Sequence, residues 1–185
     1  STLLRVLAGD APAAGGDLRR HGELRRLAPQ GLAGLDEVLA GWPRWLREAT
    51  PGDRRLSLRL MPAGIDPALA SPGERARAWL AWAVVAPADA WLLDEPSAHL
   101  DADGRAALTA WLSRLEVPAL VASHDRVLLA RADGVWSLAN ARLSSHGGGY
   151  EDFVAESAGA AARAREALAR RVQAARERSD QRVSR

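Results

Sequence analysis

The chain of 185 residues contains no cysteine, no lysine and no long apolar run. Without cysteine it can form no disulfide, no thiolate nucleophile and no cysteine-ligated zinc site. All 25 basic residues are arginine, and 23 acidic residues reduce the net charge to +2. Because arginine stays protonated far above neutral pH, the pI of about 10.2 overstates how basic the chain is at pH 7. The charge alone therefore does not predict a general polyanion binder.

Apolar segments are too short for a membrane protein. A membrane-spanning helix needs roughly 20 apolar residues, and the longest candidate, 78–93, is interrupted by Pro87 and Asp89. The first residues also do not resemble a signal peptide, since Arg5 and Asp10 enclose only a short apolar stretch. The length suffices for one domain with a short extension. We therefore expect a cytoplasmic α/β or α domain with no membrane insertion.

Helices and short apolar strands alternate between residues 71 and 143. This alternation predicts a βαβ sheet, in which ligands bind beyond the carboxyl ends of the strands. The expected helices cover 74–85, 103–115 and 126–131, and the expected strands cover 90–93, 119–122 and 135–138.

The remaining segments differ in character. The apolar spacing before Gly9 predicts a short helix that ends there, because glycine is a good C-terminal stop. The pattern predicts two edge strands within 18–30, a small, partly helical insert over 31–70 with an amphipathic segment at 35–45, and a long solvated helix over 150–185.

Two adjacent acids give the sharpest local signal. Asp94 and Glu95 end the apolar run that precedes them, and Pro96 prevents the strand from continuing. Consecutive strand residues face opposite ways, so the two carboxylates cannot do the same work. One can hold Mg²⁺ while the other faces an attacking water. The structural alternative is a strand end capped by solvated acids.

A second signal opens a helix 23 positions before Asp94. The small residues from Ser71 to Gly73 are followed by Glu74. Backbone N–H groups and the positive dipole end of a helix suit a phosphate. The alternative is an ordinary serine N-cap with a nearby glutamate.

A histidine follows the expected strand 119–122. His124 at the carboxyl end of a sheet strand can contact a phosphate or a reacting water, and the alternative is a structural histidine. Ser123, His124 and Asp125 are not a hydrolase triad, because adjacent residues cannot meet in that geometry. At the other end of the chain, Ser1 could be the last position of a G-x-x-x-x-G-K-[ST] phosphate loop, or simply the start of a helix.

Taken in order, these segments resemble an ABC-type ATPase domain, a P-loop NTPase of α/β class, over about residues 1–155. The resemblance rests on Ser1 to Gly9, Gln30, Ser71 to Glu74, Leu92 to Pro96, Leu100-Asp101 and Ser123 to Asp125. It implies ATP and Mg²⁺ as cofactors, a second ABC cassette as partner, and a start inside the Walker A motif. The implied catalytic residues are Glu95 and His124, the implied metal-binding residues are Ser1, Gln30 and Asp94, and the implied nucleotide-binding residues are Ser1, Thr2, Gln30, Ser71, Gly73, Glu74 and Asp101.

Details are similar to the ABC-F branch, whose soluble tandem ATPases act on ribosomes. The resemblance lies in Ala98-His99-Leu100-Asp101, Ser123-His124-Asp125-Arg126 and Gly148 to Phe153. It implies a partial ATPase domain over 1–147 and a basic helix over 148–185, the start of a linker or a C-terminal extension. Residues 160–185 include eight arginines and three acidic residues. Their net charge of +5 suits binding to RNA phosphates. The helix could equally be half of a coiled-coil hairpin.

The chain departs from the family pattern in three places. Pro72 stands where the signature normally has glycine, which removes one N–H donor. Trp82 stands where arginine is common, and no Gly-Lys precedes Ser1, so we expect no ATP hydrolysis by residues 1–185 alone. The pattern leaves two rival functions open, a subunit coupled to a separate membrane transporter and a non-hydrolysing nucleic-acid-binding module. It does not distinguish a first from a second cassette, or a translation role from antibiotic protection of the ribosome.

Overall fold

The structure, a computed structural model, describes residues 1–27, 34–139 and 142–183. The chain divides into two compact units, 1–125 and 126–185. The boundary expected near residue 147 falls inside the second unit and remains a prediction. In the described part of the chain, no helix is both long enough and apolar enough to cross a membrane.

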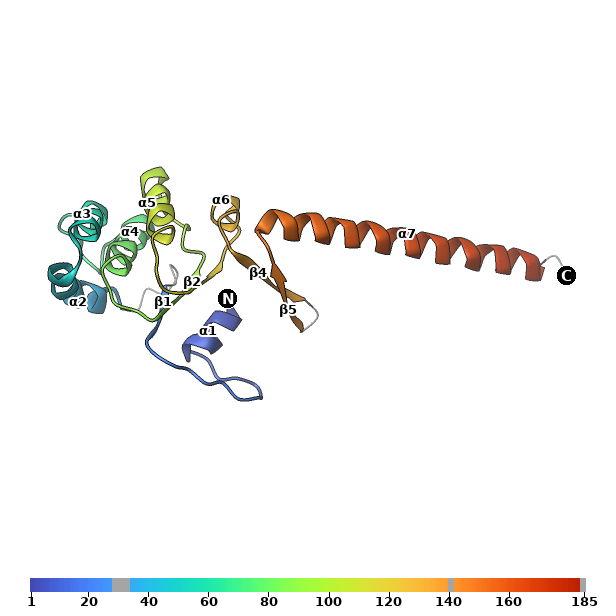
Figure 1. Cartoon of the computed structure of the whole chain (residues 1–185), viewed down its shortest axis with the longest axis horizontal. Helices are drawn as coiled ribbons and strands as arrows, with labels where there is room; N and C mark the ends of the chain where they lie inside the picture. Colours follow the sequence, from blue (N-terminus) through green and yellow to red (C-terminus); the bar gives the residue numbers. More distant parts are fainter. Residues whose placement is uncertain (28–33, 140–141, 184–185) are drawn as a thin grey trace. The chain divides into compact units, whose positions relative to one another are not determined.

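A three-stranded parallel sheet is the centre of the first unit (Figure 1). It consists of β1 (Leu24–Leu27), β2 (Ala90–Asp94) and β3 (Ala119–Ala122), with β2 in the middle. Leu27 is in register with Leu93, and Asp94 with Ala122. The carboxyl ends of the strands therefore share one edge of the sheet, and Asp94 ends the central strand there. This confirms the α/β architecture.

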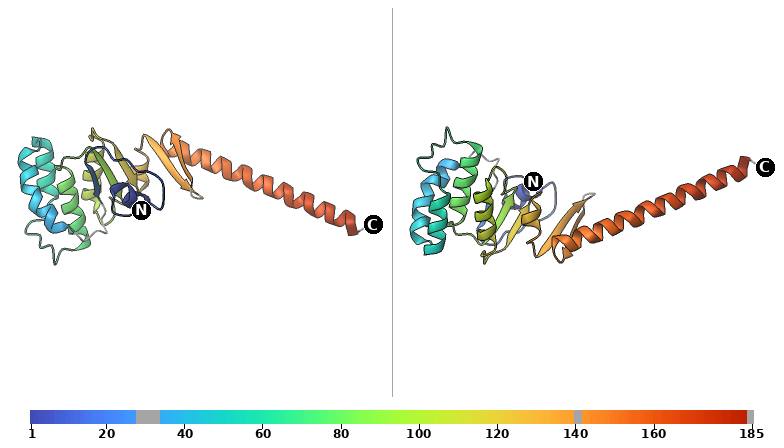
Figure 2. Two further views of the ribbon diagram at one scale, coloured as in Figure 1. Left: turned by 90° about the horizontal axis from the view of Figure 1, so that it is seen from below. Right: turned by 90° about the horizontal axis from the view of Figure 1, so that it is seen from above.

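Helices cover both faces of this sheet (Figure 2). On one face α1 (Thr2–Ala8) packs against β1 and β2. On the other face lie α4 (Pro72–Ala83) and α5 (Ala102–Leu112). The Trp91 ring contacts the Trp82 ring of α4 with centroids 5.8 Å apart, and the Trp111 ring of α5 at 5.3 Å. Gly9 ends α1 with φ of 92°, as its sequence position predicts.

The insert between β1 and α4 is more helical than expected. It contains α2 (Leu35–Glu48), which is longer than the predicted amphipathic segment, and α3 (Pro51–Leu60), which the sequence interpretation missed. Thr50 caps α3 by accepting a hydrogen bond from the Asp53 N–H at 3.2 Å, and Pro51 occupies the first turn, where its missing N–H costs nothing. Both signals are in the sequence, within a stretch that looked irregular.

The insert is joined to α4 by a buried serine. The Ser57 hydroxyl is fully buried; it accepts a hydrogen bond from the Trp42 indole at 2.8 Å and donates one to the Ala81 carbonyl at 2.5 Å. One hydroxyl thus connects α2, α3 and α4. Buried polar groups that lose such a partner destabilise the fold more than exposed ones, because water does not replace the bond.

We predict that Ser57→Ala lowers the free energy of unfolding by about 1–3 kcal/mol, since it leaves the Trp42 N–H and the Ala81 carbonyl without this partner. Urea denaturation followed by far-UV circular dichroism measures this. The matched control is Ser113→Ala at the exposed end of α5, with an expected change below about 0.5 kcal/mol. Equal stability of the two variants would contradict the role of Ser57.

The structure shows an arginine beside Trp82. The guanidinium of Arg25 on β1 lies over the Trp82 ring at 5.1 Å and over the Trp45 ring of α2 at 4.9 Å. The Arg25 guanidinium of β1 therefore contacts Trp82, at a position where the family commonly has an arginine instead of an aromatic ring. Such cation–π contacts are stronger when they are shielded from water, and the Arg25 side chain is only 17% exposed. The contact fastens the insert to the sheet.

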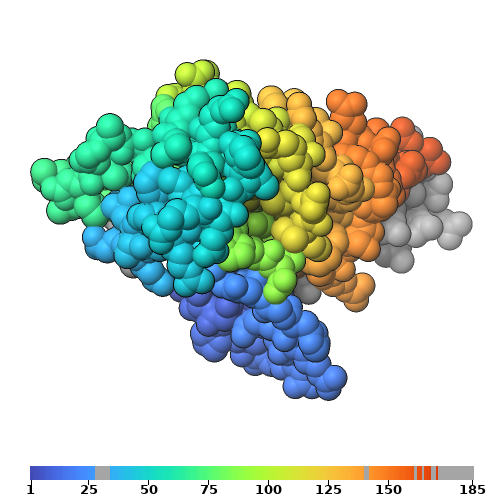
Figure 3. All heavy atoms as spheres, turned by 60° about the vertical axis from the view of Figure 1, so that its left-hand side comes forward, coloured from blue at the N-terminus to red at the C-terminus, as the bar shows by residue number. Residues whose placement is uncertain are grey.

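The segment before β1 corrects the expectation of two edge strands within 18–30. In the described part of that range only β1 forms, because residues 18–23 make other contacts instead of pairing as a strand. Arg20 donates to the Leu7 carbonyl at 2.8 Å and to the Val6 carbonyl at 3.0 Å, which satisfies the end of α1. In Figure 3 this blue N-terminal segment projects from the rest of the first unit.

The second unit contains α6 (Arg126–Leu129), β4 (Gly134–Ala139), β5 (Arg142–Gly147) and α7 (Tyr150–Val183). The expected strand at 135–138 exists, but it pairs antiparallel with β5 in a separate two-stranded sheet, with Leu138 opposite Leu143. The His146 ring lies 4.9 Å from the Phe153 ring, and its Nδ1 lies 3.5 Å from a Glu156 carboxylate oxygen. These contacts hold the start of α7 against the hairpin, and the long helix confirms the prediction for this segment.

Candidate functional site

The first acid of the pair ends the central strand. The Asp94 side chain is 17% exposed, and its carboxylate contacts the amino nitrogen of Ser1 at the start of α1. Asp94 faces α1 because it alternates with Leu93, which is fully buried among the residues of the core. The structure therefore brings Ser1 and Asp94, two of the three predicted metal-binding residues, together.

Glu95, the second acid, does not continue the strand, which ends at Asp94. Glu95 has φ of 48°, in the left-handed region that few non-glycine residues adopt. Its N–H donates to the Ala122 carbonyl of β3 at 2.7 Å, and its carbonyl accepts from Ala98 N–H at 3.0 Å, which closes a turn. The two carboxylates contact different groups, as expected. The cause is this left-handed turn rather than the alternation along a strand.

Glu95 and His124 lie together. His124 Nε2 is 3.5 Å from one Glu95 carboxylate oxygen, and the His124 backbone N–H donates to the other at 3.4 Å. The His124 side chain is 98% exposed and the Glu95 side chain 34% exposed. The imidazole is thus anchored on one side and open to a ligand on the other. The Ser123 hydroxyl accepts from the Asp125 N–H at 3.0 Å, so it serves a local turn rather than a triad.

The signature segment forms the start of α4. Ser71 is the N-cap: its hydroxyl accepts from the Glu74 N–H at 3.3 Å, while the Glu74 carboxylate accepts from the Ser71 N–H at 2.9 Å. This is a complete capping box. Pro72 occupies the first helical position, where a missing N–H is tolerated. Gly73 lies against the His99 backbone, since a Cβ on it would stand 3.3 Å from the His99 carbonyl oxygen.

The capping box has a measurable effect on Glu74. The Ser71 hydroxyl and then the Ser71 N–H donate to the ionised carboxylate, and both lower the pKa of Glu74 below its ordinary value. A lowered pKa in the folded state stabilises the fold above the unfolded-state pKa. This contribution is lost as the pH falls through the folded-state value.

We therefore predict that Glu74→Gln is less stable than the parent chain at neutral pH, and that the difference shrinks as the pH falls below the ordinary glutamate pKa. Denaturation with urea at a series of pH values measures this. Glu116→Gln, at an exposed position after α5, is the matched control and should be as stable as the parent. A difference that does not change with pH would exclude the capping carboxylate as its source.

The other predicted site residues have separate places. Asp101 is the N-cap of α5: one oxygen accepts from the Gly104 N–H at 2.9 Å and the other pairs with Arg77 at 2.9 Å. Thr2 is exposed in the first turn of α1, and Gln30 lies outside the described residues. In the described part of the chain, Ser71 and Glu74 pair with each other rather than with Glu95 or His124.

The donor set suits a magnesium ion held jointly with a substrate. No group of three or more His, Cys, Asp or Glu side chains is clustered among the described residues. Mg²⁺ prefers oxygen ligands and is usually bound by one or two carboxylates together with substrate phosphates and water. Asp94 supplies such a carboxylate, and the adjacent Ser1 carries a hydroxyl. The residues therefore fit Mg²⁺ bound with a nucleotide, without a dedicated protein cage.

Curated proteins are similar to this chain in sequence. "Probable ATP-binding protein YheS" of Escherichia coli (strain K12) is 33% identical over 83% of this chain. "Ribosome protection protein VmlR" of Bacillus subtilis (strain 168) is 31% identical, also over 83%. The chain belongs to the ABC-type ATPase domains. Its relatives are ABC-F and other ABC ATP-binding proteins, in agreement with the resemblance in the sequence.

The fold comparison agrees. The solved structure titled "RNase-L Inhibitor" has a TM-score of 0.65 over 82% of this chain and 32% of that chain, at 21% identity. No family model matches the chain. The chain spans about a quarter of the length of the relatives it matches, 26% of YheS and 27% of VmlR.

Sequence interpretation missed one group at this site. Arg77 pairs with Asp101 from 24 positions earlier in the chain. No local pattern reveals this pair, because it depends on how α4 meets the start of α5. The proximity of Glu95 and His124, in contrast, follows from the parallel pairing of β2 and β3.

Proposed function

We propose that this chain is part of an ABC-F-like cassette that binds and hydrolyses ATP and couples ATP-driven closure to engagement of a ribosome or RNA. One observation carries the proposal: the Glu95 carboxylate and the His124 imidazole meet 3.5 Å apart beside Asp94, at the carboxyl edge of a parallel sheet. Ligands of open α/β sheets bind at this edge. An acid, an imidazole and a metal-binding carboxylate together suit phosphoryl transfer to water.

Ser1, Gln30 and Asp94 would hold Mg²⁺ in this proposal. When bound, the ion would neutralise charge on the phosphate oxygens. The Asp94 carboxylate lies beside the backbone nitrogen of Ser1, so the two residues are neighbours in the fold. Thr2 would add a hydroxyl beside the phosphates from the first turn of α1.

Glu95 would orient the attacking water. Its carboxylate lies at the site edge and is held by the His124 N–H on one oxygen, which leaves lone pairs to accept a hydrogen bond from water. His124, with its exposed ring, would donate to the γ-phosphate. The ring position follows from the Glu95 contact, so the two residues would act as a unit.

Ser71, Gly73 and Glu74 would act on a nucleotide held by a second cassette, and Asp101 would lie beside it. The start of α4 is open to solvent at Ser71 and Glu74, with helix-end N–H groups suited to a phosphate. Glu74 would have to release the Ser71 N–H for a phosphate to take its place.

In the longer protein, Glu95→Gln is expected to lower ATP turnover by about 10²–10⁴-fold, the range for loss of a general base, and to accumulate the ATP-bound closed state. Glutamine keeps the size and the acceptor oxygen but cannot take a proton. Steady-state phosphate release and retention of labelled ATP after gel filtration measure the two effects. The control is Asp89→Asn, since Asp89 lies at the opposite end of β2 and binds the Glu23 N–H. Unchanged turnover in Glu95→Gln would refute the role of Glu95.

The basic helix α7 would be the RNA contact. It carries seven of the eight arginines counted above, and Arg163, Arg165 and Arg170 are exposed along it. Guanidinium groups bind phosphates in a bidentate manner. The relative named for ribosome protection supports a ribosomal partner, and we propose a cytoplasmic location to match such a partner. Whether the role is in translation or in resistance to an antibiotic then depends on the longer protein.

Replacing Arg163, Arg165 and Arg170 together by glutamine is expected to weaken RNA binding and to reduce the slope of log K against log salt by up to about 3 units for three lost phosphate contacts. Fluorescence anisotropy with a labelled ribosomal RNA fragment at several salt concentrations measures this. The matched control replaces Arg19, Arg47 and Arg55, three exposed arginines outside α7. Equal slopes for both triple variants would show that α7 is not the contact surface.

Two rival functions predict different results. A transporter subunit would use α2 and α3, which do form a helical surface in the insert, and would bind no RNA through α7. A non-hydrolysing nucleic-acid-binding module would bind RNA without ATP, and Glu95→Gln would change nothing. The contact between Glu95 and His124 favours the ATPase over the second rival.

A further inference from the structure

The segment from Glu95 to Asp101, here called the 95–101 turn, joins β2 to α5 and carries the proposed general base at its first position. Glu95 has φ of 48° and His99 φ of 62°. Left-handed backbone is unfavourable for residues with a Cβ, and it persists only where neighbouring contacts hold it. The position of the Glu95 carboxylate therefore depends on whatever fixes this turn.

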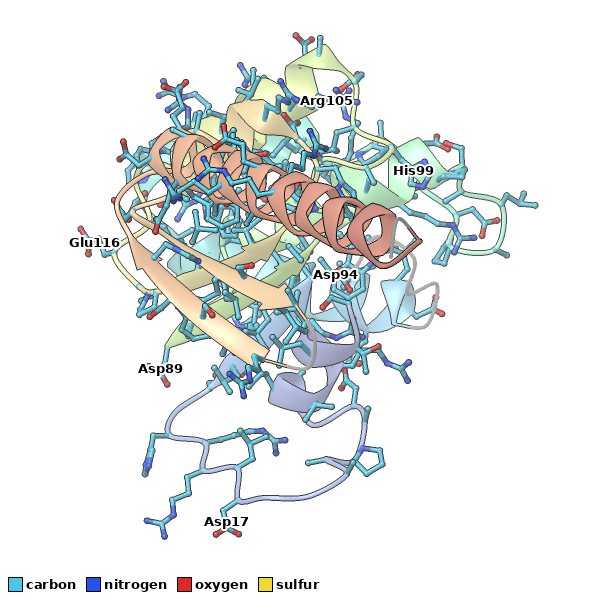
Figure 4. All side chains as sticks on the ribbon, turned by 90° about the vertical axis from the view of Figure 1, so that its right-hand side faces the viewer. Asp17, Asp89, Asp94, His99, Arg105 and Glu116 are labelled. Carbon is cyan, nitrogen blue, oxygen red and sulfur yellow. The ribbon has the colours of Figure 1, made fainter. Side chains whose placement is uncertain are left out.

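Backbone hydrogen bonds fix the near end of the 95–101 turn. Glu95 N–H donates to Ala122, and inside the turn Ala98 N–H donates to Glu95 and Leu100 N–H to Ser97, at 3.3 Å for the last pair. Figure 4 labels Asp94 just before the turn and His99 within it. None of these bonds involves Asp101, the last residue of the turn.

Asp101 and two arginines fix the far end. One Asp101 oxygen caps α5 through the Gly104 N–H at 2.9 Å. Arg105, also labelled in Figure 4, donates to the Leu100 carbonyl at 3.1 Å. The other Asp101 oxygen accepts from Arg77 Nη1 at 2.9 Å. Of these groups, only Arg77 comes from outside the turn and α5.

The same guanidinium also reaches the insert. Arg77 Nε donates to the Leu60 carbonyl and Arg77 Nη2 to the Arg59 carbonyl, each at 3.5 Å, at the carboxyl end of α3. One side chain of α4 thus connects the end of α3 with the cap of α5. A guanidinium can do this because its donors point in several fixed directions, whereas a lysine ammonium has a single nitrogen.

We propose that Arg77 is a positioning residue that holds the 95–101 turn through Asp101, and so sets the Glu95 carboxylate beside His124 according to where the insert lies. For its effect on catalysis this inference rests on the proposed ATPase function. Its structural part does not, because it concerns the turn itself. Arg77 then acts on Glu95 through Asp101 and the 95–101 turn.

The first test measures the turn directly in the 185-residue chain. In Arg77→Gln, the amides of Ala98 and Leu100 are expected to exchange with solvent about fivefold faster, the effect of losing one partly exposed ion pair. The Leu93 amide of β2 reports unfolding of the sheet, and its exchange should change less. The three-bond HN–Hα coupling of Glu95, which depends on φ, should shift as well.

The matched control is Arg114→Gln. Arg114 follows α5 and pairs with Asp53 of α3 at 3.3 Å, so it also joins this region to the insert, but it does not touch the 95–101 turn. Arg77→Lys, which keeps the charge opposite Asp101, should restore part of the protection. Equal exchange in the Arg77→Gln and Arg114→Gln variants, or equal acceleration of Leu93, Ala98 and Leu100, would overturn the proposal.

The second test uses ATP turnover by the longer protein. Arg77→Gln is expected to lower kcat by about tenfold or more with KM for ATP changed less than about twofold, because misplacement of a catalytic group affects the reaction more than binding. The kcat of Arg77→Lys should lie between those of the parent and of Arg77→Gln, and the kcat of Arg114→Gln should match the parent. A raised KM with unchanged kcat would overturn the positioning role. If Glu95→Gln leaves turnover unchanged while Arg77→Gln still loosens the turn, the proposed function fails and the structural link stands.

Discussion

The position of β2 depends on aromatic packing against two helices. Trp91 is buried between Trp82 of α4 and Trp111 of α5, and all three rings meet edge to face, as aromatic quadrupoles favour. Each such pair adds about 0.5–1.5 kcal/mol beyond the area it buries. Asp94 follows Trp91 by three residues on the same strand. The packing that fixes the middle of β2 therefore fixes the point at which its acids leave the sheet.

All basic residues of the chain are arginine, and the structure shows what their guanidinium groups contribute to the fold. Arg20 satisfies the end of α1, Arg54 donates to the Leu46 and Arg47 carbonyls at the end of α2, and Arg75 donates to the Ala70 and Pro67 carbonyls before α4. Helix ends leave carbonyls without intrahelical partners. A planar guanidinium binds two of them at once, which a lysine ammonium does with less defined geometry. These three basic side chains thus serve the fold.

The sequence predicted the parts of the site that depend on local pattern and on parallel pairing. Strand 119–122 lies where it was expected, and the helices 74–85 and 103–115 are shifted by only one to three residues in the structure. The contact of Glu95 with His124 follows from this, because Glu95 comes just after β2 and His124 just after β3, and the two strands are parallel neighbours. Contacts between distant segments could not be predicted. Arg25 between two tryptophans, Ser57 between three helices and Arg77 at Asp101 all depend on how the insert folds back, and no periodicity encodes that.

The turn between β2 and α5 combines unfavourable backbone conformations with the contacts that stabilise them. Among the described residues, the two left-handed non-glycine residues, Glu95 and His99, both lie between β2 and α5, and His99 belongs to the segment Ala98 to Asp101 on which the ABC-F resemblance rests. The left-handed turn brings the Glu95 carboxylate to His124, at a cost of about 1–3 kcal/mol for each such residue. A fold keeps a cost of this size where geometry matters more than stability, and the contacts of Asp101 with Gly104 and Arg77 are the local interactions that offset it.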